Sequence, residues 1–215
     1  MSRDTLYLYN AFMNGNIALL SGSIEETVFS VLDLETTGMS PAGGGRVCEV
    51  AVVRMQAGEV LDIFCELLNP GCTMPPEVTR IHGITDQMVR GKPRFAEVAP
   101  RLLSFLDGTA LVCHNCPFDI PFLKSEFERE GLNLPELPAL DTLRLARLHG
   151  SFPSNSLGNI VRELGFSNEG WHRAEADARM TGKLLGYFTE LLRKKGARTL
   201  EDLLRLQESK ILRRK

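Results

Sequence analysis

Two carboxylates stand at the end of an apolar segment in the first fifth of the chain. Residues 27–34 are rich in Val, Phe and Leu, which is typical of a buried strand, and Asp33 and Glu35 lie at its end. Because residues two apart on a strand point to the same face, the two side chains project together. Adjacent buried carboxylates repel each other unless a cation or a proton compensates them. A shared divalent cation is one interpretation, and an acidic strand end in solvent is the other.

Two later segments add further acidic and imidazole groups. Residues 114–119, His-Asn-Cys-Pro-Phe-Asp, follow a short apolar strand and open a helix, a position where polar groups gather at a sheet edge. Residues 172–177, His-Arg-Ala-Glu-Ala-Asp, lie where a glycine-containing loop meets a long helix. Five helical steps of about 100° would turn His172 about 140° away from Asp177. We therefore expect Asp177 to face inward from the helix while His172 reaches the same cleft from the loop, an arrangement suited to a fixed metal ligand and a mobile base.

The three segments resemble, in order and separation, the three exonuclease motifs of the DEDDh family. They are Asp-Leu-Glu-Thr-Thr-Gly at 33–38, His-Asn-x-x-Phe-Asp at 114–119 and His-x-x-x-x-Asp at 172–177. The family includes the epsilon proofreading subunit of bacterial DNA polymerase III, the exonuclease domain of PolC, ribonuclease T and oligoribonuclease. The resemblance spans about residues 27–190. Ile-His-Gly-Ile-Thr at 81–85, and Asp-Thr-Leu at 141–143 followed by Ala-Arg, are similar to the epsilon and PolC branch.

The resemblance implies a role for each acidic residue of the motifs. Asp33, Glu35, Asp119 and Asp177 would organise two divalent metal ions, and His172 would act as the general base. Oxygen ligands favour Mg²⁺ or Mn²⁺ at such a site.

The resemblance also implies a set of substrate-binding residues, which comprises Thr36, Thr37, Met39, His82 and Asn115. The two threonines would lie beside the terminal nucleotide. Met39 would wedge against the terminal base, or else would only cover the core from its loop. His82 would contact substrate, or else would stabilise a turn.

The activity implied is that of a 3′–5′ exonuclease, which hydrolyses phosphodiester bonds from the 3′ end of DNA and releases nucleoside 5′-monophosphates. Proofreading and repair are the expected settings, single-stranded or frayed DNA ends the expected substrate, and a DNA polymerase subunit a candidate partner. A 3′–5′ exoribonuclease is the alternative, because DNA and RNA share the same scissile chemistry. A non-catalytic nucleic-acid-binding or polymerase-docking module is the alternative of another class.

The elements around the motifs predict an α/β protein. Strands at 47–55 and 59–68, joined by a short connection at 56–58, would extend the first strand into an antiparallel meander. The glycine-rich loop at 38–45 lacks a P-loop lysine and is expected to be a flexible connection. The helices expected are residues 95–106, 120–130, 141–148 with Asp141 as an N-cap rather than a ligand, 156–164 and 174–194, with a strand at 110–113. We therefore expect a ribonuclease H-like, mixed five-stranded sheet with helices on both faces.

Length and composition indicate how the chain is organised into domains and how its charge is distributed. The chain has 215 residues, 43% of them hydrophobic, enough for one sizeable core. We expect an exonuclease domain at 27–195, an N-terminal extension at 1–26 and a basic helix or tail at 196–215, in which Thr199 with Asp202 resembles a helix-capping signal. Residues 193–215 hold nine basic and three acidic side chains, against 16 and 24 in the remainder. An acidic body suits carboxylates that hold cations, and the basic end either contacts a nucleic acid backbone or is a solvated helix end.

Cysteine usage and hydropathy bear on the cellular setting. The five cysteines are odd in number, which favours reduced thiols in a cytosol. Cys113 and Cys116 have the spacing of a zinc or redox pair, but no second pair of suitable spacing accompanies them. No apolar run approaches the roughly 18 residues needed to cross a bilayer, and no basic leader is seen, so we expect a cytoplasmic protein without a membrane partner.

Overall fold

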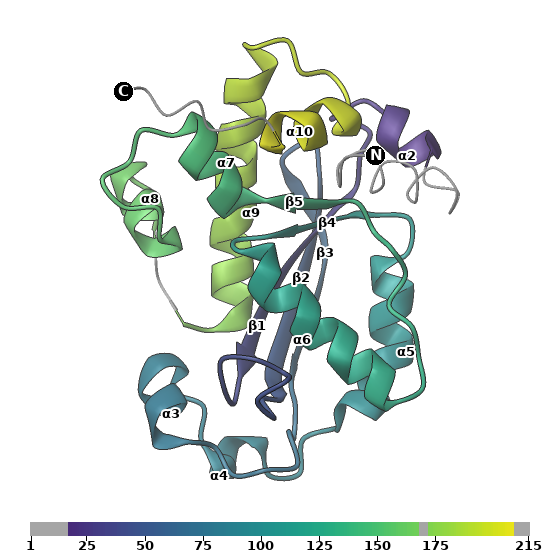
Figure 1. The fold of residues 1–215 in the computed structure, drawn as a ribbon, viewed down its shortest axis with the longest axis vertical. Helices are drawn as coiled ribbons and strands as arrows, with labels where there is room; N and C mark the ends of the chain where they lie inside the picture. Colours follow the sequence, from purple (N-terminus) through teal and green to yellow (C-terminus); the bar gives the residue numbers. More distant parts are fainter. Residues whose placement is uncertain (1–16, 168–171, 209–215) are drawn as a thin grey trace.

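The centre of the molecule is a five-stranded sheet (Figure 1), seen in a computed structural model that describes residues 17–167 and 172–208. Its strand order is β3-β2-β1-β4-β5. The strands are β1 Phe29–Thr36, β2 Val47–Gln56, β3 Glu59–Leu67, β4 Ala110–Cys113 and β5 Ala139–Asp141. β1, β2 and β3 pair antiparallel, whereas β4 runs parallel to β1 and β5 parallel to β4. The predicted antiparallel meander followed by α/β crossovers is thereby confirmed.

The β2–β3 connection is a tight hairpin. Ala57 has a φ of 50° and Gly58 a φ of 87°, so both residues are left-handed. Two-residue turns with positive φ at both positions match the twist of the strands they join. The short connection expected at 56–58 is therefore present, and it keeps the first three strands in one uninterrupted meander.

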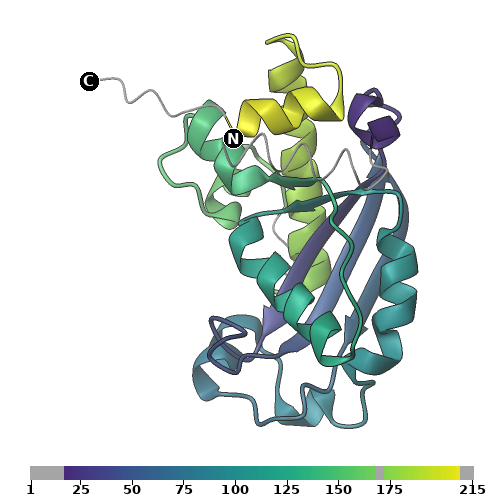
Figure 2. The ribbon, with the colours of Figure 1, turned by 45° about the vertical axis from the view of Figure 1, so that its right-hand side comes forward.

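Helices cover both faces of the sheet (Figures 1 and 2). The long helix α9, Ala174–Arg193, packs against β1 and β2 on one face, while α6, Cys116–Arg129, packs on the other face beside α5, Phe95–Leu106. Alternation along β1 divides its side chains between two hydrophobic clusters. Val31 belongs to the cluster that includes α9, and Leu32 and Leu34 belong to the cluster that includes α5 and α6. Asp33 and Glu35 share the parity of Val31, so they project toward the α9 face.

Short helices complete the fold. α3, Pro76–His82, and α4, Asp86–Val89, follow β3 and lie at the lower end of the molecule in Figure 1, where they bury Val78, Ile84 and Val89 in a third small cluster. α7, Thr142–His149, and α8, Leu157–Glu163, pack beside α9. The expected helix at 120–130 begins earlier, at Cys116, because Pro117 occupies the first helical turn, where its missing N–H costs no hydrogen bond.

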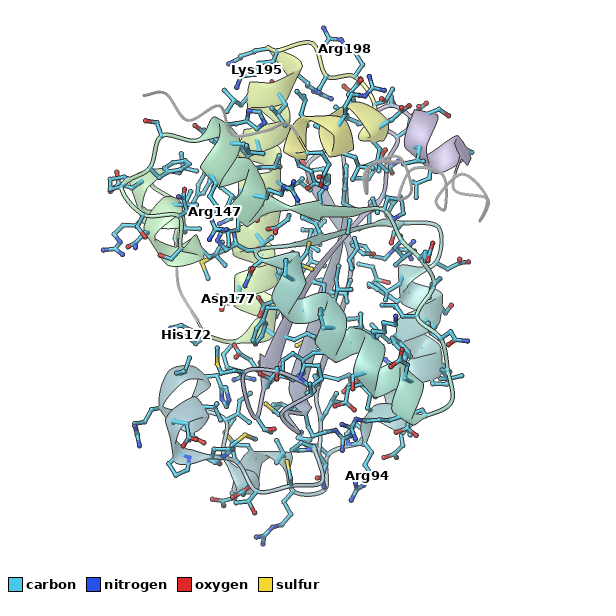
Figure 3. All side chains as sticks on the ribbon, viewed as in Figure 1. Arg94, Arg147, His172, Asp177, Lys195 and Arg198 are labelled. Atoms are coloured by element: carbon cyan, nitrogen blue, oxygen red, sulfur yellow. The ribbon has the colours of Figure 1, made fainter. Side chains whose placement is uncertain are left out.

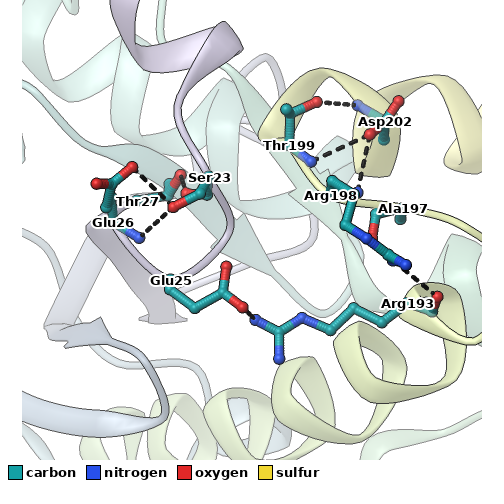
Figure 4. A network of polar contacts seen from close by, with 9 residues as sticks. All are labelled: Ser23, Glu25, Glu26, Thr27, Arg193, Ala197, Arg198, Thr199 and Asp202. Carbon is teal, nitrogen blue, oxygen red and sulfur yellow. Dashed lines mark hydrogen bonds and ion pairs between the residues drawn. The ribbon is translucent and has the colours of Figure 1, made fainter.

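The first and last described helices meet at the opposite end from α3. α2, Ile17–Ser21, packs against α10, Leu200–Gln207, and an isolated bridge joins Ser23 to Thr199. Figure 4 shows the surrounding polar contacts, which include the Arg193–Glu25 ion pair and the predicted cap of α10, formed by Thr199 and Asp202. Helix α10 therefore shares one core with α9, across the position where we expected a domain boundary. None of the helices in the described ranges is long and apolar enough to cross a membrane.

Candidate active site

Three carboxylates from two distant segments meet at the end of β1. Asp33, Glu35 and Asp177 each offer an oxygen, and these oxygens lie within 4.8 Å of one another. The alternation of β1 turns the first two toward α9, and Asp177 lies in the first turn of that helix. Asp177 is buried, and its Oδ1 has no hydrogen-bond partner among the described residues. The structure therefore brings together three of the four carboxylates that the sequence singled out.

Asp119 approaches the same place from the other side of the sheet. It is buried, at 4% exposure, in the first turn of α6, and it lies outside the group of three just described. A backbone hydrogen bond from Leu34 holds it against β1. Among the neighbouring charges, Asp119 is the one that raises the pKa of Asp33 most. The fourth carboxylate is thus an electrostatic neighbour of the other three, at a greater distance.

Burial raises the pKa values of these four carboxyl groups, so they are weaker acids than usual. Loss of solvent, followed by repulsion from Asp177, raises the pKa of Glu35 to about 8. Burial likewise raises the pKa of Asp119 to about 8 and that of Asp177 to about 7, although a backbone hydrogen bond from His172 opposes the shift at Asp177. The pKa of Asp33 is also raised, first by burial and then by its acidic neighbours. The site holds more carboxylates than can be charged together near neutral pH without a cation.

His172 lies directly before α9 and beside Asp177 (Figure 3). Its side chain is exposed, and its backbone hydrogen-bonds the Asp177 carboxylate. Its φ is 63°, a left-handed conformation that is uncommon for a residue with a side chain. The imidazole therefore projects from a loop while the carboxylate projects from the helix, as the spacing of the motif predicts.

The residues after β1 hold one another in a closed turn. The hydroxyl of Thr36 donates to the carbonyl of Gly38 at 2.7 Å, and the hydroxyl of Thr37 accepts from the backbone N–H of Arg46 at 2.9 Å. Both threonines are buried. Met39, in contrast, is 79% exposed at the start of the following loop. It covers no core in this structure, so its side chain is free to meet a ligand.

His82 ends helix α3 and is buried against the end of β1. Its Nδ1 accepts from the backbone N–H of Ile84 at 3.0 Å, so it does stabilise the turn at Gly83. Its Nε2 is buried, and the ring also contacts the backbone of Thr36. Burial lowers the pKa of His82, while the backbone of Thr36 opposes that shift. His82 is thus a buried residue that lies against the Asp33 motif.

Asn115 and Asp141 form a junction at the carboxyl ends of β4 and β5. Asn115 is exposed, has a left-handed φ of 95°, and donates its backbone N–H to Asp141 Oδ1 at 3.0 Å. Asp141 also caps α7 by accepting from Leu143 and Arg144, as predicted. His114 faces away from the carboxylates, because its ring nitrogens contact Thr142 Oγ1 and the carbonyl of Asn155.

Two arginine–glutamate pairs were not found from the sequence. Glu49 in β2 pairs with Arg173, and Glu126 in α6 pairs with Arg46; both glutamates are only 1% exposed. The second pair fixes the loop after β1 to α6, because Glu126 also accepts from the backbone N–H of Val47. The available signal was a glutamate inside the apolar strand at 47–55, since a buried charge requires a partner.

The chain is similar to known exonucleases over most of its length. A family model described as exonuclease, of the RNase T type, matches residues 30–185. This chain belongs to the RNase T exonuclease family. It is 35% identical over 181 residues to the 3′–5′ exonuclease DinG of Bacillus subtilis, which covers 84% of this chain and 19% of that protein. It is 34% identical over 187 residues to the PolC-type DNA polymerase III of Streptococcus agalactiae, which covers 86% of this chain and 12% of that protein.

The exonuclease fold is also found among solved structures. Escherichia coli Exonuclease I in complex with a dT13 oligonucleotide superposes with a TM-score of 0.70 at 21% identity, over 79% of this chain and 42% of that chain. These findings confirm the resemblance to the DEDDh exonucleases and the ribonuclease H-like fold. This exonuclease chain spans less than a fifth of the length of the two curated relatives named above.

Proposed function

We propose that this chain is a metal-dependent 3′–5′ exonuclease that hydrolyses DNA from its 3′ end and releases nucleoside 5′-monophosphates. The observation that carries the proposal is the convergence of Asp33, Glu35 and Asp177 within 4.8 Å, with Asp119 as their electrostatic neighbour. The exonuclease family model supports it, as does similarity to a relative named as a 3′–5′ exonuclease.

The donor set fits divalent cations. All four candidate ligands are carboxylates, and hard oxygen donors favour Mg²⁺ or Mn²⁺ over softer metals. The buried Oδ1 of Asp177, which has no hydrogen-bond partner among the described residues, is an acceptor that a cation would satisfy. We propose that Asp33, Glu35, Asp119 and Asp177 hold two ions. When bound, two such ions supply activation of the attacking water and stabilisation of the leaving 3′ oxygen.

The protein side chains divide the remaining tasks. His172 is exposed on the loop beside Asp177, and we assign it the removal of the proton from the attacking water. The hydrogen bonds of Thr36 and Thr37 hold the chain in a closed turn after β1, where the terminal nucleotide would lie. Met39 offers an exposed apolar surface on which an unstacked base would rest. His82 would pack against this turn. Asn115 would contact the DNA strand from the side of the site formed by α6.

DNA is the substrate we favour over RNA. The relative from Streptococcus agalactiae is named as a DNA polymerase, and Exonuclease I was solved with a DNA oligonucleotide. The exoribonuclease alternative keeps the same carboxylates and differs only in the preferred sugar. A DNA polymerase subunit is the protein partner to be tested.

The test is a side-by-side digestion of 5′-labelled single-stranded DNA, duplex DNA with a mismatched 3′ end, and RNA of the same sequence. With Mg²⁺ we expect DNA ladders that shorten from the 3′ end, EDTA to stop them, and added Mg²⁺ or Mn²⁺ to restore them. Faster digestion of RNA would favour the exoribonuclease. Failure to digest any strand, with Mn²⁺ binding retained, would favour a non-catalytic binding module.

A further inference from the structure

An ion pair between the buried Glu49 and the partly exposed Arg173 lies beside the candidate active site. Glu49 accepts two hydrogen bonds from Arg173 Nε, at 3.2 and 3.1 Å, and one from Arg173 Nη2 at 2.5 Å. The same carboxylate accepts from the backbone N–H of Ala174 at 2.9 Å. Glu49 is 1% exposed, so nearly all of its hydrogen-bonding capacity is used within the protein.

The sheet register sets the place of this pair. Glu49 in β2 lies directly opposite Glu35 in β1, and cross-strand partners project to the same face. Arg173 directly follows His172, and Ala174 is the first residue of α9. One carboxylate of the sheet therefore fixes both the residue next to the candidate base and the start of the helix that carries Asp177.

The turn at His172 needs such a constraint. The N-cap residue of α9, Arg173, makes no side-chain cap of its own, so the Glu49 carboxylate caps the helix from another strand. His172 holds a φ of 63°, a conformation that is uncommon for a residue with a side chain. The contacts of Arg173 and Ala174 with Glu49 fix the chain on the C-terminal side of that turn.

The pair also separates two carboxylates that stand side by side. Without a partner, Glu49 would add a charge next to Glu35, and its proximity does raise the pKa of Glu35. The guanidinium of Arg173 acts in the opposite direction on Glu35. Because Arg173 and Ala174 occupy its oxygens, Glu49 is directed to the loop and not to the cluster of Asp33, Glu35 and Asp177.

We propose that Glu49 and Arg173 are positioning residues for His172, which set the left-handed turn that presents the imidazole to the reacting water. This inference rests on the proposed function, because it takes His172 as the general base. The contacts of the pair are with each other and with the start of α9, so its effect on His172 is transmitted through the loop. Its loss should therefore lower the rate of the chemical step and leave substrate binding nearly unchanged.

A double-mutant cycle tests the inference on the full chain. Single-turnover rates and KM are measured for Arg173→Ala, His172→Ala and the double variant on labelled single-stranded DNA with Mg²⁺. We expect Arg173→Ala to lower kcat about 10- to 100-fold with KM changed less than about threefold. In the His172→Ala background the same change should have almost no further effect, since residues that act as a unit are not additive.

Matched variants separate positioning from folding. Arg173→Lys keeps the charge but not the planar fork, and should restore part of the rate. Arg179→Ala removes an exposed ion pair with Glu175 on the same helix and should leave the rate unchanged. Mn²⁺ binding by calorimetry should be similar for wild type and Arg173→Ala.

Three results would overturn the inference. Additive losses in the double variant would show that Arg173 does not act through His172, as would loss of Mn²⁺ binding in Arg173→Ala. Wild-type activity in His172→Ala would remove the base itself. The proposed function fails separately, because it requires the wild-type chain to digest DNA, whereas the inference concerns only differences among active variants.

Discussion

At the residue scale, the candidate site is a group of acids that the fold withdraws from water. Asp119 and Asp177 are buried, and Asp33 and Glu35 are half-buried at the end of β1. Buried carboxylates are retained where a cation or a proton compensates them. The sequence predicted the cluster because their order matched the DEDDh motifs. It did not predict the pairing of Glu49 with Arg173, since a glutamate inside an apolar strand indicates a buried charge but does not say which residue, here 124 positions away, is its partner.

Substitutions at these residues should lower the cleavage rate to different extents, according to the role of each residue. We expect Asp33→Ala to reduce cleavage below detection, because it removes an acid shared by the whole cluster. His172→Ala should retain a small residual rate, about 10²–10⁴-fold below wild type, the usual contribution of a general base. Single-turnover digestion of labelled DNA measures both. Near-normal turnover by Asp33→Ala would contradict the assignment.

The raised pKa values of these carboxyl groups predict how stability varies with pH. In the metal-free protein the pKa is about 8 for Glu35 and about 7 for Asp177, against roughly 4 in an unfolded chain. Between pH of about 4 and 8 the folded state binds protons that the unfolded state has released, so this site makes the free energy of unfolding fall as pH rises. We expect the Tm of EDTA-treated protein to decline from pH 5 to 8.

Two further Tm measurements, one with Mn²⁺ and one with a matched variant, test whether the site causes this decline. Mn²⁺ competes with protons for the same oxygens, so it should raise the Tm more at pH 8 than at pH 5. The double variant Glu35→Gln, Asp177→Asn should show a shallower decline without metal. Equal declines for variant and wild type would mean that the site does not govern the pH dependence.

At the element scale, the alternation of side chains along β1 and the position of α9 determine which carboxylates come together. Hydrophobic periodicity predicted β1 to β3, α5 and α9 closely, because each has a long apolar face. It did not predict α4, which has four residues, or β5, which has three. β5 is held by pairing with β4 and by Gln207, whose amide bonds the backbone of Ala139 and Asp141. Such elements depend on tertiary partners more than on local pattern.

The Arg46–Glu126 pair links two elements of the site, and its removal should be costly. Glu126→Ala leaves the partly buried Arg46 guanidinium and the N–H of Val47 without their acceptor. Breaking a buried pair typically costs about 3–5 kcal/mol. Lys124→Ala, which removes an exposed pair with Glu128 on the same helix, should cost less than about 0.5 kcal/mol. Urea unfolding compares the two, and equal losses would contradict the structural role of Glu126.

At the scale of the whole molecule, the described ends of the chain meet at one pole, whereas His172 and Asp177 lie nearer the middle, between that pole and the short helices α3 and α4 (Figure 3). Leu200, Leu203 and Leu204 of α10 are buried in the same cluster as Val31 and Phe188. The sequence predicted the cap of α10 and a basic helix or tail, but it did not predict the three inward leucines as part of the core, because the charges are more conspicuous. Lys195 and Arg198 are seen beside this pole in Figure 3.

This packing predicts that α10 belongs to the cooperative unit. Leu203 is 1% exposed, and Leu203→Ala should lower the free energy of unfolding by about 2–5 kcal/mol. Arg205→Ala, which removes an exposed pair with Glu201 on the same helix, is the matched control and should change it by less than about 0.5 kcal/mol. A wild-type Tm for Leu203→Ala would show that α10 unfolds independently.

The central claim is that four carboxylates, distant in sequence, hold a pair of divalent cations at the end of β1. A crystal structure of the chain grown with Mn²⁺, with anomalous scattering to locate the metal, tests it most directly. We expect two Mn²⁺ peaks about 3.5–4 Å apart, bound by Asp33, Glu35, Asp119 and Asp177. Saturating Mn²⁺ with no peak among these side chains would contradict it.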